Sequence, residues 1–175
     1  IVHSQNSLRL AEKWYQSSRG FKVIPLLRDI APSKERKDLR TKYGLGKKDV
    51  VVASFGFLGP TKQNHRLLEA WKMAGLSLNS RYKLFFVGDT EADDYGQSMR
   101  RKVESGEYGT NITIVGWTEA DEHQEYLQLT DVAIQLRTLS RGETSAAVLD
   151  CMNNGIATIV NANGSMADIP EDTVF

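Results

Sequence analysis

Short runs of apolar residues recur at regular intervals from residue 49 onward. Five of these runs cover residues 50–55, 83–87, 112–115, 132–136 and 156–160, and the first of them is rich in β-branched side chains. Runs that are apolar at most positions are typical of parallel strands, because both faces of a parallel sheet are covered. We therefore predict one parallel sheet built from these five runs.

Between the runs, the apolar positions have helical spacing. Leu67, Leu68 and Trp71 share one face of a helix that Asn64 is expected to cap. Further helices are predicted over 95–104, 119–129 and 146–154. Repeated alternation of strand and helix favours right-handed crossovers with helices on both faces of the sheet. The sequence thus predicts an α/β, Rossmann-like fold of three layers.

The first part of the chain does not follow this alternation. A helical stretch in which Leu8, Leu10 and Trp14 cluster is predicted to end at Gly20. We expect residues 1–20 to be an interdomain linker and helix that belong to a missing N-terminal half.

Residues 21–175 are predicted to form the main domain. Residues 21–25 are a short β-like run, and Ser33 is expected to cap a charged helix that extends to Tyr43. The chain begins at Ile1 rather than at methionine and stops at Phe175 just after an acidic turn. We therefore expect a piece of a longer protein, truncated at the C-terminus of this domain.

Composition narrows the classes of partner. The 22 basic and 22 acidic side chains cancel, so no net field draws the chain to nucleic acid, and no apolar run approaches membrane-spanning length. The single cysteine, Cys151, lies among apolar helical positions, which indicates a core residue and a reducing compartment. We expect a cytoplasmic protein without a transmembrane segment.

Charged and hydroxyl side chains crowd between the fourth run and the helix that follows it. This stretch holds Arg137, Ser140, Arg141, Glu143, Thr144 and Ser145. A helix that starts at Thr144 or Ser145 aims unpaired N–H groups at whatever lies before it, which suits a phosphate or diphosphate. A capped helix without a ligand is the alternative.

Two carboxylates favour the ligand. Glu143 and Asp150 are seven residues apart, about two helical turns, and are predicted to share one side of the helix. There they would hold sugar hydroxyls, and Arg141 would pair with a carboxylate or a phosphate oxygen.

Ligands of parallel α/β sheets bind outside the carboxyl ends of the strands. Glycines stand at three of these exits, at Gly56, Gly88 and Gly116. Lys62 follows the first exit, and either reaches a diphosphate or is solvated. Trp117 follows the third exit, and either stacks on a base or caps the core beside Tyr126.

Other kinds of site lack their main feature. No strand is followed by a glycine-rich dinucleotide fingerprint or by a phosphate-binding loop that ends in Lys and Ser or Thr. The three histidines, His3, His65 and His123, lack metal-ligand spacing, and His65 and His123 are interpreted as surface helix residues. No metal site is predicted.

The ordered set of segments resembles the carboxyl-terminal, donor-binding half of a GT-B glycosyltransferase of family 4, glycosyl transferases group 1. The resemblance extends over nearly the whole chain. It rests on residues 23–25, SFGFLGPTK at 54–62, LLEAW at 67–71, FVGD at 86–89, IVGW at 114–117, TDVA at 130–133 and residues 142–155.

The resemblance implies transfer of a sugar from a nucleotide-diphosphate donor with retention of anomeric configuration, without a metal or other cofactor. Lys62 matches the family lysine that grips the diphosphate, whereas Phe57 stands where the family carries an arginine. Arg137 and Arg141 are candidates to supply that charge.

The family also carries two glutamates seven residues apart. Asp150 matches the second, which holds the ribose, and Gly142 stands at the first, so Glu143 is the candidate catalytic residue one position later. The remaining residues expected to contact the nucleotide are Gly56, Gly116, Trp117, Thr144 and Ser145.

The missing half is expected to hold a glycan or lipid-linked acceptor, and to bring the enzyme to the inner face of the membrane for polysaccharide or glycoconjugate synthesis. The chain alone is then expected to bind the donor without turnover. Two alternatives remain at this point: a non-catalytic nucleotide-sugar-binding or scaffold module, and a GT-B nucleotide-sugar epimerase.

Overall fold

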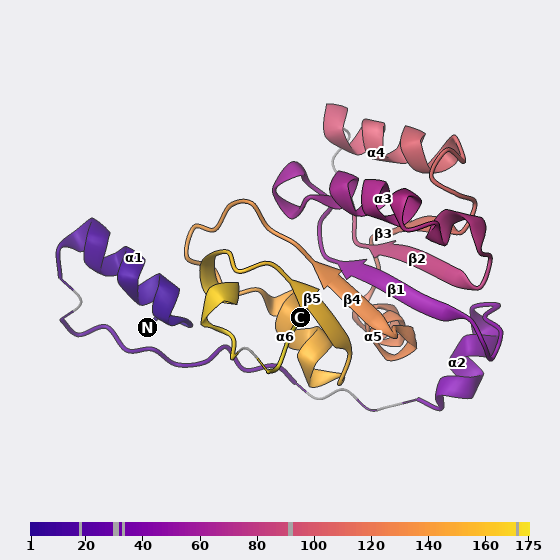
Figure 1. The fold of residues 1–175 in the computed structure, drawn as a ribbon. Coiled ribbons are helices and arrows are strands. Elements are labelled where there is room, and N and C mark those ends of the chain that lie inside the picture. The colour runs from indigo at the N-terminus through magenta and orange to yellow at the C-terminus, as the bar shows by residue number, and fades with distance from the viewer. Residues whose placement is uncertain (18, 30–31, 33, 91–92, 171) are drawn as a thin grey trace.

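A parallel sheet forms the centre of the molecule. The structure is a computed structural model that describes residues 1–17, 19–29, 32, 34–90, 93–170 and 172–175. Within these residues the sheet has five strands in the order β3-β2-β1-β4-β5, and every neighbouring pair is parallel (Figure 1). The strands are β1 (Val50–Phe55), β2 (Tyr82–Val87), β3 (Ile112–Gly116), β4 (Val132–Gln135) and β5 (Ala157–Val160).

Helices cover both faces of the sheet (Figure 1). On one face α3 (Asn64–Met73) and α4 (Asp94–Glu104) bury Trp71 and Met99 against strand residues such as Val52. On the other face α2 (Arg36–Lys42), α5 (Ala120–Leu129) and α6 (Ala146–Asn153) pack against residues such as Phe55. Successive strand side chains point to opposite faces, so each apolar strand residue reaches one of these layers. The predicted three-layer Rossmann-like fold is confirmed.

The predicted strands and the core cysteine are confirmed, with shifts of about one residue at the strand ends. Cys151 is fully buried on α6. The prediction that Asn64 caps α3 is wrong: the cap is Gln63, and Asn64 Oδ1 instead accepts from Gly59 N at 3.2 Å. The predicted cap Ser33 lies outside the described residues, and α2 begins at Arg36.

Helix α1 (Gln5–Tyr15) stands apart from the sheet (Figure 1). It ends at Tyr15 and not at Gly20, because Gln16 takes the left-handed conformation (φ 54°) that stops a helix. Trp14 is 80% exposed, so the apolar cluster predicted here does not pack into the core. The helix is attached through Arg9, whose Nη2 lies 2.7 Å from Asp168 Oδ1.

The β-like run predicted at residues 21–25 is not a strand. Val23 forms one isolated parallel bridge with Val2 and does not join the sheet. The boundary at residue 20 stays a prediction.

A buried carboxylate attaches α2 to α5. Glu125 accepts from Lys34 Nζ at 2.6 Å, from Lys42 Nζ at 2.5 Å and from the Tyr43 hydroxyl at 2.6 Å. These three donors lower the pKa of Glu125 from its ordinary value of 4.5 to about 2.

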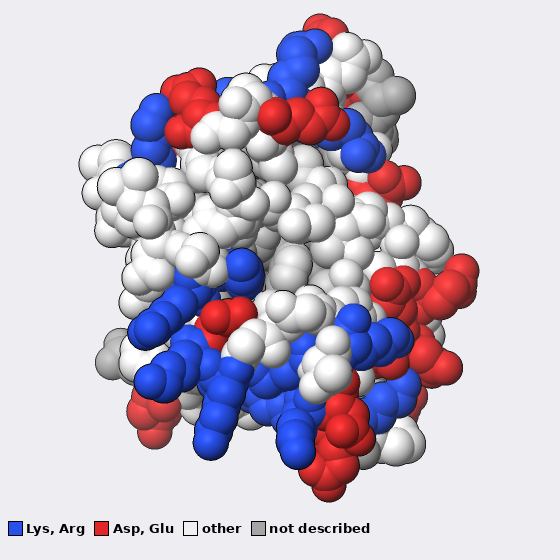
Figure 2. All heavy atoms as spheres, turned by 90° about the vertical axis from the view of Figure 1, so that its right-hand side faces the viewer, with Lys and Arg blue, Asp and Glu red and all other residues white. Residues whose placement is uncertain are grey.

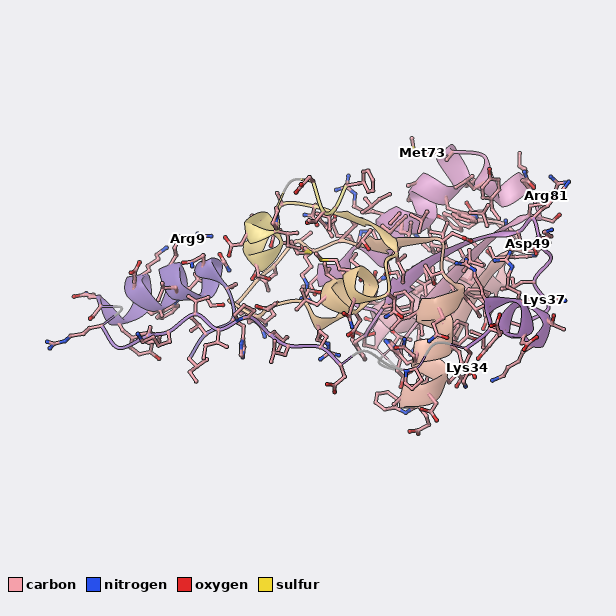
Figure 3. The ribbon with its side chains drawn as sticks, turned by 90° about the horizontal axis from the view of Figure 1, so that it is seen from below. Arg9, Lys34, Lys37, Asp49, Met73 and Arg81 are labelled. Atoms are coloured by element: carbon pink, nitrogen blue, oxygen red, sulfur yellow. The ribbon has the colours of Figure 1, made fainter. Side chains whose placement is uncertain are left out.

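Seen from the side where α2 lies, Lys and Arg gather in the lower half of the molecule (Figure 2). Arg81, just before β2, and Lys37 of α2 lie at this end of the sheet (Figure 3). Within the described part of the chain, no helix is long and apolar enough to cross a membrane.

Candidate functional site

A cavity of about 810 Å³ opens at the carboxyl ends of the strands. This volume suits a ligand of nucleotide size. Its walls come from the exits of β1, β2 and β3, from α5, from α6 and from the segment before α2. The lining includes Leu27, Arg28, Gly56, Phe57, Gly88, Asp89, Trp117, Glu119, His123, Glu125 and Asp150.

The glycines at two strand exits are required by close backbone contact. A Cβ built on Gly88 would lie 2.3 Å from the carbonyl oxygen of Gly56, which no side chain tolerates. Gly56 itself has φ 92°, a conformation that favours glycine. The two exits therefore approach closely, and Gly56 and Gly88 both line the cavity with bare backbone.

Trp117 presents an open aromatic surface to the cavity. Its side chain is 76% exposed and lines the wall. Tyr126, by contrast, is buried with its ring centroid 4.9 Å from that of Tyr43. The alternative in which Trp117 caps the core beside Tyr126 is therefore wrong. Gly116 ends β3 just before it with φ 86°, and is not among the lining residues.

Asp150 lines the cavity from α6, and it is already paired. Its Oδ1 accepts from Arg28 Nε at 2.6 Å, and its Oδ2 accepts from Arg28 Nη2 at 2.9 Å. This hydrogen bond raises the pKa of Arg28. No sequence pattern indicates this pair, because the two residues are 122 positions apart.

The two helical histidines are not surface residues as predicted, because both are half-buried. His123 lines the cavity with its ring centroid 5.4 Å from that of Phe55. Burial lowers its pKa, against the opposing effect of Asp150. His65 Nδ1 lies 3.2 Å from the Tyr95 hydroxyl on the α3–α4 side. Burial and ring contacts suffice to account for His65.

Lys62 lies directly beside Gly56. It ends the 3₁₀ turn η1 (Pro60–Lys62), and a Cβ built on Gly56 would lie 2.7 Å from Lys62 Nζ. Burial and the nearby charge of Arg137 lower the Lys62 pKa from 10.5 to about 8, and Glu143 opposes the shift. Among the described residues no carboxylate lies within ion-pair distance of its Nζ. Lys62 is therefore half-buried without an ion pair among the described residues.

Glu143 pairs with Arg137 in the loop before α6. Its Oε1 lies 2.9 Å from Arg137 Nη1, and its Oε2 accepts from Arg141 N at 2.7 Å. The helix begins only at Ala146, so the prediction that Glu143 and Asp150 share one side of it is wrong. The loop places the two carboxylates against different arginines.

The start of α6 has one hydroxyl that caps and one that does not. Ser145 is the cap, and its Oγ accepts from Val148 N at 3.4 Å. Thr144 Oγ1 is buried and makes no hydrogen bond within the described part of the chain. Arg141 is exposed. Among the described residues, its contact with Glu143 is made by the backbone N–H of Arg141 and not by its guanidinium.

The site thus consists of two parts that meet at Gly56. The cavity holds an exposed indole and a carboxylate, and beside it lie the cations Lys62 and Arg137 with the start of α6. No group of three or more His, Cys, Asp or Glu side chains that could hold a metal ion occurs among the described residues.

Comparison with solved structures shows the same fold in glycosyltransferases. HepE from Anabaena in complex with UDP and glucose superposes with a TM-score of 0.79 at 19% identity, over 98% of this chain and 46% of HepE. Sucrose-phosphate synthase from Thermosynechococcus elongatus gives 0.76 at 20% identity, over 100% of this chain and 44% of the synthase. This chain therefore spans less than half the length of either protein.

The same fold also occurs in a C-terminal domain whose structure was solved by itself. The C-terminal domain of LpcC, a glycosyl transferase group 1 family protein from Francisella tularensis, gives a TM-score of 0.66 at 16% identity, over 81% of this chain and 72% of that domain. No curated protein sequence matches this chain. Residues 35–174 match the family described as "Glycosyl transferases group 1". The fold agrees with that of GT-B glycosyltransferases. Since the family match also includes most of the sequence, the chain belongs to the glycosyl transferases group 1.

Proposed function

We propose that this chain is the donor-binding half of a retaining glycosyltransferase that uses a nucleotide-diphosphate sugar. The observation that carries the proposal is the junction at Gly56, where a nucleotide-sized cavity meets a half-buried lysine that has no ion pair among the described residues. A nucleoside diphosphate has the same two parts, a base with its ribose and a doubly charged tail. HepE, solved with UDP and glucose, has the same fold and supports this assignment.

In this proposal Trp117 stacks on the base, and the carboxylate of Asp150 accepts hydrogen bonds from the ribose hydroxyls. Lys62 and the N-terminus of α6, with Thr144, Ser145 and Arg141, receive the diphosphate. The buried hydroxyl of Thr144 without a partner then gains an acceptor. Glu143, the candidate catalytic residue by resemblance, lies in the loop before α6, where it forms an ion pair with Arg137.

The acceptor is proposed to be a glycan or a lipid-linked glycan, held by a domain outside this chain. This arrangement fits a cytoplasmic enzyme of polysaccharide or glycoconjugate synthesis, with peripheral contact at the inner membrane face. The chain by itself then binds the donor but does not transfer its sugar. The diphosphate charge is neutralised by side chains, so transfer is proposed to proceed without a metal and in the presence of EDTA.

Calorimetric titration of the chain with UDP, GDP and ADP tests the proposal. One nucleoside diphosphate is expected to bind, and Asp150→Asn and Trp117→Ala are each expected to weaken it about tenfold, or 1.4 kcal/mol. Arg81→Gln is the control, because Arg81 lies at the opposite end of the sheet (Figure 3). Failure of all three nucleotides to bind, or binding that neither cavity variant weakens, would contradict the proposal.

A specific observation keeps the non-catalytic binding module as a second candidate: Phe57, an apolar side chain, lines the cavity at the exit of β1. Such a module binds the nucleotide in the same way but transfers no sugar. Product analysis of the parent protein, with and without an acceptor, separates transfer from mere binding and from epimerisation of the donor.

A further inference from the structure

The backbone of Arg137 is fixed more firmly than a loop residue needs. Its N–H donates to Asn161 Oδ1 at 2.7 Å, and its carbonyl accepts from Asn161 Nδ2 at 2.7 Å. The next residue, Thr138, donates its N–H to the carbonyl of Thr61 at 2.8 Å. These contacts join the exits of β4 and β5 to the turn that carries Lys62. The two cations are therefore held at a set position relative to each other.

The charges of this cluster do not balance. Arg137 and Lys62 lie close enough that the charge of Arg137 disfavours the ammonium of Lys62. Glu143 is the carboxylate that pairs with Arg137, and it leaves Lys62 without an ion pair among the described residues. Two cations and one carboxylate give a local excess of one positive charge in a partly buried place, which costs free energy that a bound anion would offset.

Arg137 also keeps free hydrogen-bond donors. Its side chain is 19% exposed, and within the described part of the chain it makes one contact, from Nη1 to Glu143 Oε1. Nε and Nη2 remain, and a guanidinium presents such donors as a planar fork that fits phosphate oxygens. At the exit of β1 the cavity wall is the apolar Phe57, so charge at this edge comes from the β4 side.

We propose that Arg137 binds the diphosphate of the donor together with Lys62, and that Glu143 is a positioning residue that holds the guanidinium of Arg137. This inference rests on the proposed function, because it requires a nucleoside diphosphate in the cavity. It gives Glu143 a role that acts through Arg137, in contrast to direct contact with the donor sugar.

The test compares three ligands of one base, namely the nucleoside diphosphate, its sugar conjugate and the nucleoside without phosphate. In Arg137→Gln, affinity for the diphosphate is expected to fall about tenfold or more, with nucleoside affinity unchanged within about twofold. Arg137→Lys should be intermediate, since lysine keeps the charge without the fork. Arg81→Gln serves as the matched control, and thermal unfolding checks that each variant is folded.

Glu143 is tested by a double-mutant cycle. Glu143→Gln alone is expected to weaken the nucleoside diphosphate about threefold. If Glu143 acts through Arg137, the same change has no further effect on the diphosphate or the sugar conjugate in the Arg137→Gln background. A loss of the sugar conjugate that persists in that background would overturn the positioning role and favour direct contact with the sugar.

Three other results would overturn the assignment of Arg137. If Arg137→Gln leaves the diphosphate affinity unchanged while Asp150→Asn still weakens it, Arg137 does not bind the diphosphate. The proposed donor site is then unaffected. Equal losses for nucleoside and diphosphate show that Arg137 only supports the fold. No binding of any ligand to the unsubstituted chain rejects this inference together with the proposed function.

Discussion

Lys62 is a residue at which stability and ligand binding oppose each other. Burial beside Gly56 lowers its pKa to about 8, so the charged form is disfavoured in the folded chain. Between about pH 8 and 10.5 the unfolded chain binds the extra proton, and stability therefore rises with pH across this window. At neutral pH the half-buried ammonium therefore lowers the free energy of unfolding, and under the proposed function the diphosphate offsets this cost.

Lys62→Met is therefore expected to stabilise the free chain at pH 7, on the order of 2 kcal/mol in free energy of unfolding, while weakening a nucleoside diphosphate at least about tenfold. Urea denaturation and calorimetric titration measure the two effects. The stability gain should shrink as the pH rises from 8 toward 10.5, because the folded chain no longer carries the charge, and it should be smallest above pH 10.5, where the lysine becomes neutral in both states. Lys47→Met, at an exposed lysine, is the control. A less stable Lys62→Met would show that favourable contacts hold the ammonium.

Sequence reasoning identified the types of residue in the candidate site better than their pairings. Trp117 and Asp150 could be placed at the cavity because parallel strands end at one edge and the helix after β4 starts there. The Arg28–Asp150 pair could not be predicted, since it depends on where a distant segment lies. The position of Glu143 could not be predicted either. The helix starts three residues after it, and Glu143 lies in the preceding loop, where it forms an ion pair with Arg137.

At the scale of elements, α2 is held by side-chain contacts to two carboxylates, Glu125 of α5 and Asp131, which accepts from Arg36 Nη2 at 2.6 Å. Apart from Leu39 it buries no side chain of its own, and Glu125 receives Lys34, Lys42 and Tyr43 from its two flanks and its last turn. A carboxylate that accepts several charged or hydroxyl donors has a low pKa and loses this stabilisation on protonation. The attachment of α2 is therefore sensitive to acid.

Glu125→Gln is expected to lower the free energy of unfolding by about 2 kcal/mol at pH 7, because an amide cannot satisfy two ammonium groups. The pKa of Glu125 is depressed to about 2, so its contribution is complete above pH 4.5 and is lost as the pH falls from 4.5 toward 2. Urea titrations between pH 7 and pH 3 measure this: the difference between the two chains should narrow on acidification. A constant difference would mean that packing, and not charge, accounts for the loss.

The elements themselves could be predicted to different degrees. The five strands followed from apolar runs, although burial differs among them: β1 is buried at nearly every position, whereas the edge strand β5 exposes Ala157 and Ile159. The end of α1 did not follow from the sequence, because the stop is the left-handed Gln16 and not a glycine. The run at 21–25 has strand-like composition, but it lacks a neighbouring strand beyond the bridge to Val2. Composition alone does not supply such a partner.

At the scale of the whole molecule, the segment after α1 passes below α6 on its way to α2 (Figure 1). Leu27 and Arg28 of this segment line the cavity, and the guanidinium of Arg28 holds Asp150 with two hydrogen bonds. A ribose that binds Asp150 must first displace this guanidinium. Under the proposed function, donor binding is thus expected to release the side chain of Arg28 from Asp150.

Arg28→Gln is accordingly expected to raise the affinity for a nucleoside diphosphate about two- to fivefold, the equivalent of one partly exposed ion pair. Calorimetric titration gives the affinity directly. Arg9→Gln is the matched control, since Arg9 forms a similar pair with Asp168 on η3 (Gly164–Asp168), and is not among the cavity-lining residues. Weaker binding by Arg28→Gln would mean that Arg28 itself contacts the ligand.

The three tryptophans of the chain sit in three different surroundings. Trp71 is 2% exposed in the core, Trp14 projects from α1, and Trp117 stands at the cavity wall. Trp71 therefore emits at shorter wavelength and follows unfolding, whereas a base stacked on Trp117 quenches a solvent-exposed emitter. With Trp14 replaced by phenylalanine, the natural fluorescence of the chain separates into one signal for the integrity of the fold and one for the occupancy of the cavity, and no dye is needed.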